Sequence, residues 1–597
     1  MTPVDKSTVV KALKDMSVYL QLKGENTFKT RAYDLAAERI AGLAEDLQAI
    51  VEQKRLTTLP NIGESIGAKI EDLVLTGKMH ALEELRATWP PRILELLTVQ
   101  DLGPKKAKVL FEQLGVGSID DLEKACTMHQ VRDLKGFGQK TEDKLLAGIA
   151  LARRSMGAGG RKRLGDVEEQ AAALLAWMQA APGVKRASLG GSVRRWRETV
   201  ADVDIIASAK DAAPVFEHFL KFPQVAQTMS SGESKASVRL KETDLQVDLR
   251  VLPDEDFASA LHHFTGSKAH HIHLRGLAME KGLTISEWGV FRMGEGEGAE
   301  RKKGTSKHEG AEEKLPIKEE KDLYALLGMQ FIPPELREDW GEIEAALAHT
   351  LPEDLITAED IRGNVHMHTT WSDGRDSLEA MALAAKALGY KYLTVTEHSQ
   401  TSNYAGGLSL DRLKSQWGEI DSVQAKVPGI TLLKGIESDI LEDGSLDYPD
   451  AVLEQLDVVI GSIHQRYSQD EEAMTKRVLR AFDNPHLHVW GHPTGRLLLK
   501  RDPAPMRMEE ILDKAAKKGI VIEVNGCPDR MDLASENVRK ALERGLKLVV
   551  STDAHSVSEL KTHLPYAVAT ARRGWARKGD VLNTRDVKGF RAGLSRR

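Results

Sequence analysis

The spacing of hydrophobic residues changes character along the chain. Residues 1–85 show the helical spacing of short amphipathic helices, as in residues 28–40, FKTRAYDLAAERI. Residues 244–251, DLQVDLRV, instead alternate with a period of two, which predicts a strand with one polar face. From residue 362 onward, short apolar runs alternate with helical stretches such as residues 377–388. These changes predict a helical region, a mixed region and a strand–helix region.

The strand–helix region predicts a parallel barrel. Enzymes of that architecture carry their chemistry at the C-terminal ends of the strands. Six of the seven apolar runs in this region end in His, Asp or Glu. The runs are residues 363–368, 392–398, 431–437, 456–464, 487–492, 520–525 and 546–555.

The polar residues at these strand ends are candidate metal ligands. Nitrogen and oxygen donors without thiolates suit zinc, manganese or iron, and nine donors are too many for one ion. The alternative is that these nine residues fall at strand ends by chance, and their number makes that improbable. The candidate ligands are His366, His368, Asp373, His398, Glu437, His464, His492, Asp553 and His555.

A second candidate site lies in residues 190–207, GGSVRRWRETVADVDIIA. Asp202 and Asp204 are two apart on a predicted strand, so they share a face and lie roughly 6–7 Å apart. Carboxylates that close repel each other unless a cation lies between them, and Asp248 on a neighbouring strand completes a site for two divalent ions. The preceding turn offers Gly191, Ser192 and Arg195 to a triphosphate. A solvated pair on an edge strand is the alternative, but the turn and the arginines favour a metal–triphosphate site.

Three turns in the first 150 residues share an apolar-plus-glycine pattern that opens a helix: residues 59–70, 99–110 and 134–145. Such helix-hairpin-helix turns let backbone amides approach a DNA phosphate without regard to sequence. One copy alone is more often an ordinary helix–helix turn, whereas three favour DNA binding. The first copy has Asn61 where a glycine is expected, and asparagine tolerates positive φ. The candidate DNA contacts are Gly63, Gly67, Gly103, Lys105, Gly136 and Gly138.

Composition narrows the class of protein only slightly. A chain of 597 residues predicts three or more domains. The net charge of −6 gives no general support for nucleic-acid binding, which therefore rests on the motifs. Two cysteines far apart in the sequence indicate a reducing compartment, and no apolar run approaches about 18 residues. We expect a soluble, cytoplasmic protein without membrane partners.

The front half resembles the family X DNA polymerases, the group that includes polymerase beta. The matching pieces are GGSVRR, the DVD of residues 202–204, VDLRV around Asp248, FTGS at residues 264–267, and Arg275. The resemblance implies nucleotidyl transfer with Mg²⁺ or Mn²⁺, with Phe264 and Gly266 near the nucleotide and Arg275 on the template side. It also aligns Lys69 with a Schiff-base lysine that removes 5′-deoxyribose phosphate, where a surface lysine is the alternative. His263 replaces a family tyrosine, so discrimination against ribonucleotides is open.

The rear half resembles the polymerase and histidinol phosphatase (PHP) domain through HMHTTWSDG, TEHS, GIE, SIH, GHP and DAH. This resemblance implies up to three ions, Mn²⁺ or Zn²⁺. The first takes His366, His368, Glu437 and Asp553, the second Glu437, His464 and His492, and the third Asp373, His398 and His555. Glu397 stands where the family usually has aspartate, beside a ligand.

The order of the two halves resembles the bacterial PolX proteins. It implies a gap-filling repair polymerase with a 3′–5′ exonuclease and an AP-endonuclease activity, acting on gapped or nicked DNA and deoxynucleoside triphosphates as a monomer. There are two alternatives. In one, the PHP half is a small-molecule phosphatase; in the other, the protein is a DNA-binding scaffold whose metals are structural. We predict a helical 8-kDa-like domain (1–88), fingers (89–160), an α/β nucleotidyltransferase palm (161–258), a thumb (259–338), a linker (339–360), a (β/α)7 PHP barrel (361–575) and a tail (576–597).

Overall fold

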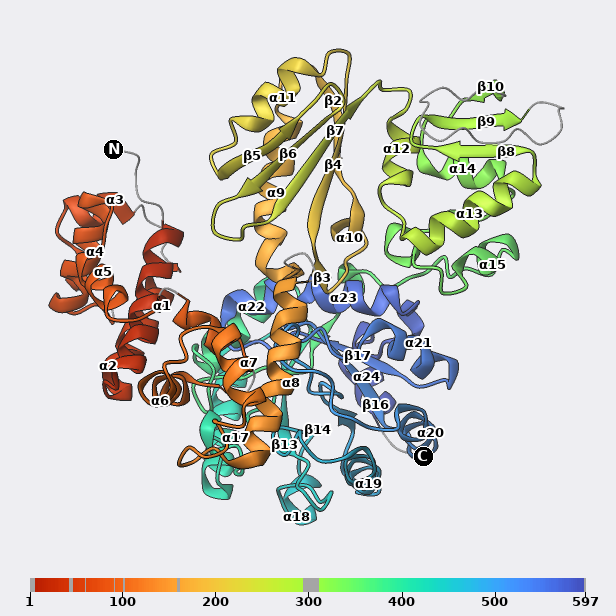
Figure 1. The fold of residues 1–597 in the computed structure, drawn as a ribbon. Coiled ribbons are helices and arrows are strands. Elements are labelled where there is room, and N and C mark those ends of the chain that lie inside the picture. The colour runs from red at the N-terminus through yellow and green to blue at the C-terminus, as the bar shows by residue number, and fades with distance from the viewer. Residues whose placement is uncertain are drawn as a thin grey trace. The chain divides into compact units, whose positions relative to one another are not determined.

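The structure is a computed structural model that describes residues 6–41, 47–59, 61–90, 92–99, 102–157, 161–293 and 311–594. The chain forms two compact units, Met1–Ala158 and Gly159–Arg597. The predicted fold class is confirmed: helical hairpin domains, an α/β palm with a thumb, and a seven-stranded parallel barrel (Figure 1). Among the described residues, no helix has both the length and the hydropathy that spanning a bilayer requires.

The first unit is helical, and its core is built from one apolar face of each helix. Leu13, Ile40, Ile70 and Leu110 are fully buried there. The helices are α1 (Lys6–Lys23), α2 (Thr27–Ala41), α3 (Leu47–Glu52), α4 (Glu64–Thr76), α5 (His80–Ala87), α6 (Pro104–Leu114), α7 (Ile119–Thr127) and α8 (Gly138–Gly157).

The palm is a five-stranded sheet in the order β2-β4-β7-β6-β5, in which only β4 and β7 run parallel to each other. Its central strands are fully buried at Val203, Ile205 and Leu249. The palm elements are β1 (Lys162–Arg163), α9 (Leu164–Gln179), β2 (Val184–Leu189), α10 (Gly191–Arg194), β3 (Thr199–Val200), β4 (Asp202–Ala209), α11 (Ala213–Leu220), β5 (Val225–Ser231), β6 (Lys235–Leu240) and β7 (Gln246–Leu252).

The thumb combines helices with a three-stranded antiparallel sheet in the order β10-β9-β8. Tyr324 and Leu274 are fully buried in its core. Its elements are α12 (Phe257–His263), α13 (Lys268–Glu280), β8 (Leu283–Ser286), β9 (Gly289–Met293), β10 (Ala311–Leu315), α14 (Glu320–Leu326) and α15 (Glu342–Leu347).

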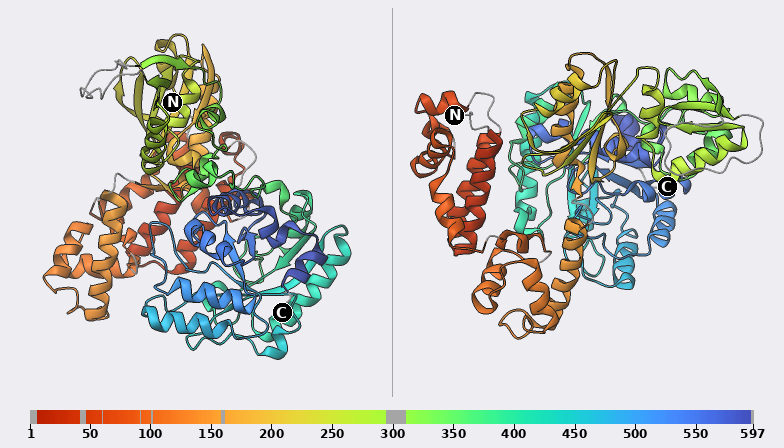
Figure 2. Two further views of the ribbon diagram at one scale, coloured as in Figure 1. Left: turned by 90° about the vertical axis from the view of Figure 1, so that its right-hand side faces the viewer. Right: turned by 45° about the horizontal axis from the view of Figure 1, so that its top comes forward.

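Seven parallel strands in sequence order form the barrel, with helices outside them (Figures 1 and 2). A bridge between Met367 and Ala554 joins the chain after the first strand to the chain after the last. The strands are β11 (Gly363–Asn364), β12 (Tyr392–Val395), β13 (Thr431–Asp439), β14 (Val458–Ser462), β15 (Val489–Trp490), β16 (Val521–Asn525) and β17 (Leu548–Ser551). The helices are α16 (Leu378–Ala387), α17 (Leu410–Lys426), α18 (Asp450–Leu453), α19 (Glu471–Ala481), α20 (Met508–Lys518), α21 (Ser535–Glu543), α22 (Val557–Thr562) and α23 (Leu564–Arg573).

The segment expected as a tail packs against the barrel as far as residue 594. It contains α24 (Val587–Leu594), whose Phe590 ring stacks on Tyr392 with the centroids 4.9 Å apart. Both side chains belong to a buried apolar cluster with Val458 and Val489. This cluster fills the end of the barrel opposite the candidate metal ligands, because its members lie toward the starts of the strands.

The barrel and the palm share a polar interface within the second unit. Arg573 on α23 is 1% exposed and donates from Nη1 to the Arg195 carbonyl oxygen at 2.7 Å and to Glu338 Oε1 at 3.0 Å. Tyr566 on the same helix donates to Glu168 Oε2 at 2.6 Å. Buried charge-assisted hydrogen bonds of this kind fix the orientation of the palm against the barrel.

Candidate functional site

Two adjacent parallel strands of the palm bring its three aspartates together near the starts of the strands. The register of β4 and β7 pairs Asp204 with Asp248, and Asp202 lies two residues before Asp204 on the same strand face. Lys235 on β6 approaches the group, with its Nζ 2.7 Å from Asp248 Oδ2. The structure therefore brings together the aspartates that the sequence singled out.

The electrostatics around these three aspartates suit a bound cation. Burial, and then the charges of Asp202 and Asp248, raise the pKa of Asp204 to about 6. Burial and Asp248 also raise the pKa of Asp202. Burial would raise the pKa of Asp248 too, but hydrogen bonds from Lys235 and neighbouring side chains hold it below its ordinary value. Partly buried carboxylates with raised pKa values form a donor set that fits Mg²⁺ or Mn²⁺.

Metal-free protein should become more stable when Asp204 is replaced by asparagine. Its folded-state pKa of about 6 exceeds the ordinary 3.8, so the folded chain holds the proton more tightly than the unfolded chain. The carboxylate therefore costs stability as the pH rises from 3.8, and fully above about 6. For Asp204→Asn we expect a gain of about 1–3 kcal/mol at about pH 8 and almost none at about pH 4, from urea denaturation in EDTA. Equal gains at both pH values would contradict this origin.

The turn before these strands is tightly packed against the aspartates. Gly190 donates to the Asp204 carbonyl at 2.8 Å, and Gly191, with φ +58°, donates to the Phe264 carbonyl at 2.5 Å. A Cβ at Gly191 would lie 2.6 Å from Asp204 Oδ2, so only glycine fits there. Ser192 follows in α10.

Arg195 is engaged elsewhere in this structure. Its Nε lies 3.0 Å from Glu338 Oε1, and its Nη1 donates to the Thr265 carbonyl at 2.6 Å. Arg194 pairs in the same way with Glu320, at 2.6 Å. A triphosphate contact from the Arg195 side chain would require these bonds to break. Sequence reasoning had no local signal for these bonds, because the partner residues lie 70 to 143 residues away along the chain.

The other nucleotide-side candidates lie together. The Phe264 ring is 4.2 Å from the Arg250 guanidinium, and a Cβ at Gly266 would lie 2.9 Å from the His270 ring. His263 and His271 stack with ring centroids 5.1 Å apart. Burial lowers the pKa of both rings, that of His271 to about 3, so both are neutral at physiological pH. Arg275 lies further along α13.

The glycines of the hairpin turns are open to an approaching backbone. Gly63 and Gly103 precede α4 and α6, and a Cβ at either would meet nothing within 4 Å. Gly136 and Gly138 have φ of +90° and +69°, and Asn61 has φ +66°, as expected for its place in the first turn. Amides at such helix starts suit a phosphate.

Lys69 and Lys105 both lie on helices that follow these turns. Gly67 lies in α4, where a Cβ would be 3.5 Å from the Thr57 methyl group. The Lys69 ammonium donates to the Ser65 carbonyl at 2.9 Å and to its hydroxyl at 3.0 Å. These are ordinary contacts of an exposed helical lysine. The described contacts of Lys69 thus fit the surface-lysine alternative as well as a nucleophile.

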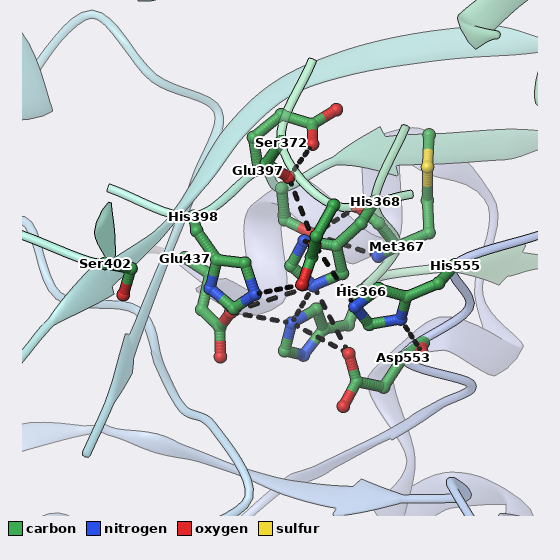
Figure 3. A network of polar contacts seen from close by, with 12 residues as sticks. His366, Met367, His368, Ser372, Glu397, His398, Ser402, Glu437, Asp553 and His555 are labelled. Carbon is green, nitrogen blue, oxygen red and sulfur yellow. Dashed lines mark hydrogen bonds and ion pairs between the residues drawn. The ribbon is translucent and has the colours of Figure 1, made fainter. Parts of the chain in front are cut away.

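The nine predicted barrel ligands converge at the C-terminal ends of the strands. Figure 3 shows His366, His368, His398, Glu437, Asp553 and His555 among them. In the first predicted set, His366 Nε2 and His368 Nε2 are 3.2 Å apart. His366 Nε2 lies 3.5 Å from both Glu437 Oε2 and Asp553 Oδ1, and His368 Nε2 lies 3.3 Å from Asp553 Oδ1. His366, His368 and Asp553 thus have ligand atoms within 4.8 Å of one another, and Glu437 lies beside this group.

The second and third sets are assembled as well. Glu437 Oε1 lies 2.8 Å from His492 Nε2 and 3.1 Å from His464 Nε2. Asp373 lies 3.5 Å from His398 Nε2 and 3.3 Å from His555 Nε2. The sets are less separate than expected, because His398 Nδ1 also lies 2.9 Å from Glu437 Oε2, and His368 belongs to the Asp373 group too.

The geometry of this cluster fits bound ions better than direct pairing. Glu437 is fully buried, and neither of its carboxylate oxygens makes a well-directed hydrogen bond within the described part of the chain, despite imidazole nitrogens at 2.8–3.5 Å. Burial raises its pKa, yet His464, His366 and His398 hold it well below the ordinary value. An ionised carboxylate beside imidazole nitrogens that do not hydrogen-bond to it is a donor set that fits Mn²⁺ or Zn²⁺.

Two carboxylates that sequence reasoning did not single out orient these ligands. Glu523 in β16 accepts from His366 Nδ1 at 2.6 Å, and Asp439 at the end of β13 accepts from His464 Nδ1 at 2.5 Å. Such bonds fix the tautomer and present Nε2 to an ion. A charged residue inside an apolar strand was the available signal for Glu523. Glu397 accepts from Thr369 and Ser372 and so lies beside the ligands, as expected.

Models of four known families match the chain in the order of its domains. The helix-hairpin-helix domain matches residues 5–79, and the SAM-like helix-hairpin-helix tandem matches residues 93–150. The DNA polymerase beta thumb matches residues 260–338, and the PHP domain matches residues 364–526.

Curated relatives match different shares of the chain. The DNA polymerase/3′–5′ exonuclease PolX of Bacillus subtilis (strain 168) is 37% identical over 592 residues, which cover 99% of each chain. A probable phosphatase of Thermoanaerobacter sp. (strain X514) is 31% identical over 189 residues, 28% of this chain and 74% of that protein. A probable phosphatase of Caldanaerobacter subterraneus is 30% identical over 203 residues, 32% and 75% of the two chains. Because it is 37% identical to a PolX protein over 99% of both chains, the chain belongs to the PolX family of DNA polymerase/3′–5′ exonucleases.

Proposed function

We propose that the front half fills short gaps in damaged DNA. The observation that carries this proposal is the register that sets Asp204 opposite Asp248, with Asp202 on the same face. Mg²⁺ or Mn²⁺ held there would assist the attacking 3′-hydroxyl and the leaving pyrophosphate. The hairpin glycines hold gapped or nicked DNA by its phosphates, and the turn at Gly191 and Ser192 receives the deoxynucleoside triphosphate.

The barrel is the proposed 3′–5′ exonuclease. The nine converging donors support a centre of up to three ions, which when bound would activate water and offset charge on a phosphodiester. Glu523 and Asp439 keep the Nδ1 protons of His366 and His464 and leave their Nε2 lone pairs free. Cutting DNA beside abasic sites is a second phosphodiester reaction that the same centre could perform.

A small-molecule phosphatase is the rival function for the barrel. Its support is the identity with probable phosphatases over 74% and 75% of their lengths. Against it stands the full-length identity with a polymerase/exonuclease. The donor set alone does not distinguish a diester from a monoester.

A single-nucleotide gapped duplex with a 5′-labelled primer tests both halves. With Mn²⁺ and triphosphates we expect extension, and without triphosphates shortening from the 3′ end. A parallel reaction with histidinol phosphate should release phosphate at least about 100-fold more slowly per enzyme, because the DNA contacts are absent. Extension without shortening, together with fast release from histidinol phosphate, would favour the phosphatase.

A further inference from the structure

Arg530 is a partly buried cation that faces the barrel metal ligands and belongs to none of the predicted sets. It lies in the loop after β16, residues 526–532. Its Nε is 3.9 Å from Asp553 Oδ2, and its side chain is 20% exposed. Its Nη1 is buried and has no hydrogen-bonding partner among the described residues. A charged donor therefore faces the metal pocket with hydrogen-bonding capacity unused.

An unpaired buried guanidinium nitrogen is costly unless a ligand completes it. Two other arginines of the barrel, Arg477 and Arg501, show how such groups can be satisfied, whereas Nε and Nη2 of Arg573 are also buried without a partner among the described residues. Arg477 donates to the carbonyls of Ile440, Leu441 and Gln465, and Arg501 donates from Nε and Nη2 to the Gly495 carbonyl. Arg501 lies over the same tyrosine ring, Tyr467, that neighbours Arg530. Proximity to the pocket alone does not leave an arginine unpaired.

The backbone under Arg530 is held from two sides. Arg496 donates from Nε to the Arg530 carbonyl at 2.9 Å, and Leu498 N donates to the Asp529 carbonyl at 2.7 Å. The palm adds ion pairs from Glu198 to Arg496, at 3.4 Å, and from Arg163 to Asp529. The backbone that carries the guanidinium is thus held in place before any substrate arrives, and such preorganisation favours an effective electrostatic contact.

We propose that Arg530 binds a non-bridging phosphate oxygen of the DNA strand being shortened and stabilises the negative charge that grows there during hydrolysis. The free Nη1 is the donor for that oxygen, and the anionic ligands nearby keep the guanidinium charged. This inference rests on the proposed nuclease function of the barrel. It also makes Glu198 and Arg163 of the palm positioning residues for the nuclease site.

The test uses full-length protein that carries Asp202→Asn, so that extension does not compete with shortening. Arg530→Met preserves the length of the side chain and removes the charge, and Arg530→Lys keeps the charge without the fork. Arg501→Lys, which changes a satisfied arginine over the same ring, is the matched control. For Arg530→Met we expect kcat/KM on a 5′-labelled single strand to fall on the order of 100-fold, as for loss of one preorganised donor. We expect Arg530→Lys to be intermediate and Arg501→Lys to stay within about 3-fold.

Two readouts other than activity separate a phosphate contact from a structural role. Calorimetric titration with inorganic phosphate should show an affinity loss on the order of 10-fold in the manganese-loaded Arg530→Met protein, at unchanged manganese content. Unchanged phosphate affinity, or lost manganese with restored kcat/KM at higher manganese, would overturn the inference. A wild-type protein that shortens no DNA would instead refute the proposed function, and the phosphate titration would still report on Arg530.

Discussion

Replacing Glu437 by glutamine should abolish 3′-end shortening, by at least about 10³-fold, and leave primer extension within about 2-fold of wild type. Its two oxygens lie 2.8–3.5 Å from the imidazoles of His492, His464, His398 and His366, so it is shared between the first two predicted ion sets. Glutamine keeps the shape, but it removes the charge and replaces one acceptor by a donor. Bound manganese, measured by elemental analysis after dialysis, should fall by one or more ions per chain.

Glu397→Gln is the matched control for that experiment. Glu397 is equally buried, but its oxygens accept from Thr369, Ser372 and Gln416 and do not face the ligand cluster. The same chemical change there should leave the manganese content unaltered and lower shortening by no more than about 10-fold. If the Glu437→Gln protein kept its manganese and its shortening rate, the barrel ligands would not be the nuclease site.

The sequence predicted those parts of the molecule that leave a local pattern. The barrel could be read from strand-length apolar runs that end in ligands, because successive parallel strands place their C-terminal ends together. The palm aspartates could be read from period-two spacing, and Asn61 from its tolerance of positive φ. Each signal lies within a few residues of the feature it predicts.

Features that depend on distant partners could not be read in this way. The engagement of Arg195 depends on Glu338 and on the Arg573 helix, which meet it only after the palm and barrel have packed. A charge within an apolar strand marks Glu523 as unusual, but its partner is set only when the fold places it 2.6 Å from His366. The packing of α24 against Tyr392 likewise has no nearby sequence mark. Long-range packing decides which polar groups remain free for chemistry.

Asp204→Asn should lower gap filling by at least about 10³-fold at saturating triphosphate, although it stabilises the metal-free fold. The expected gain in stability and loss of activity have one origin. The Asp204 carboxylate is close to Asp202 and Asp248, so its charge is costly without a bound ion and necessary for holding one. This stability–activity trade-off is expected of a preorganised site. Single-turnover extension on a one-nucleotide gap measures the loss, and gel-shift titration should show unchanged DNA affinity, because the hairpins are untouched.

Asp244→Asn provides the control on the same stretch of chain. Asp244 is exposed, lies just before β7 and bonds to Arg239, and its φ of +52° is one that asparagine adopts readily. The substitution removes the same charge within four residues of Asp248 but outside the paired face, so extension should stay within about 2-fold of wild type. Equal losses in the two variants would mean that general charge near the palm supports synthesis. A loss of extension confined to Asp204→Asn would show that synthesis requires the carboxylates paired between β4 and β7.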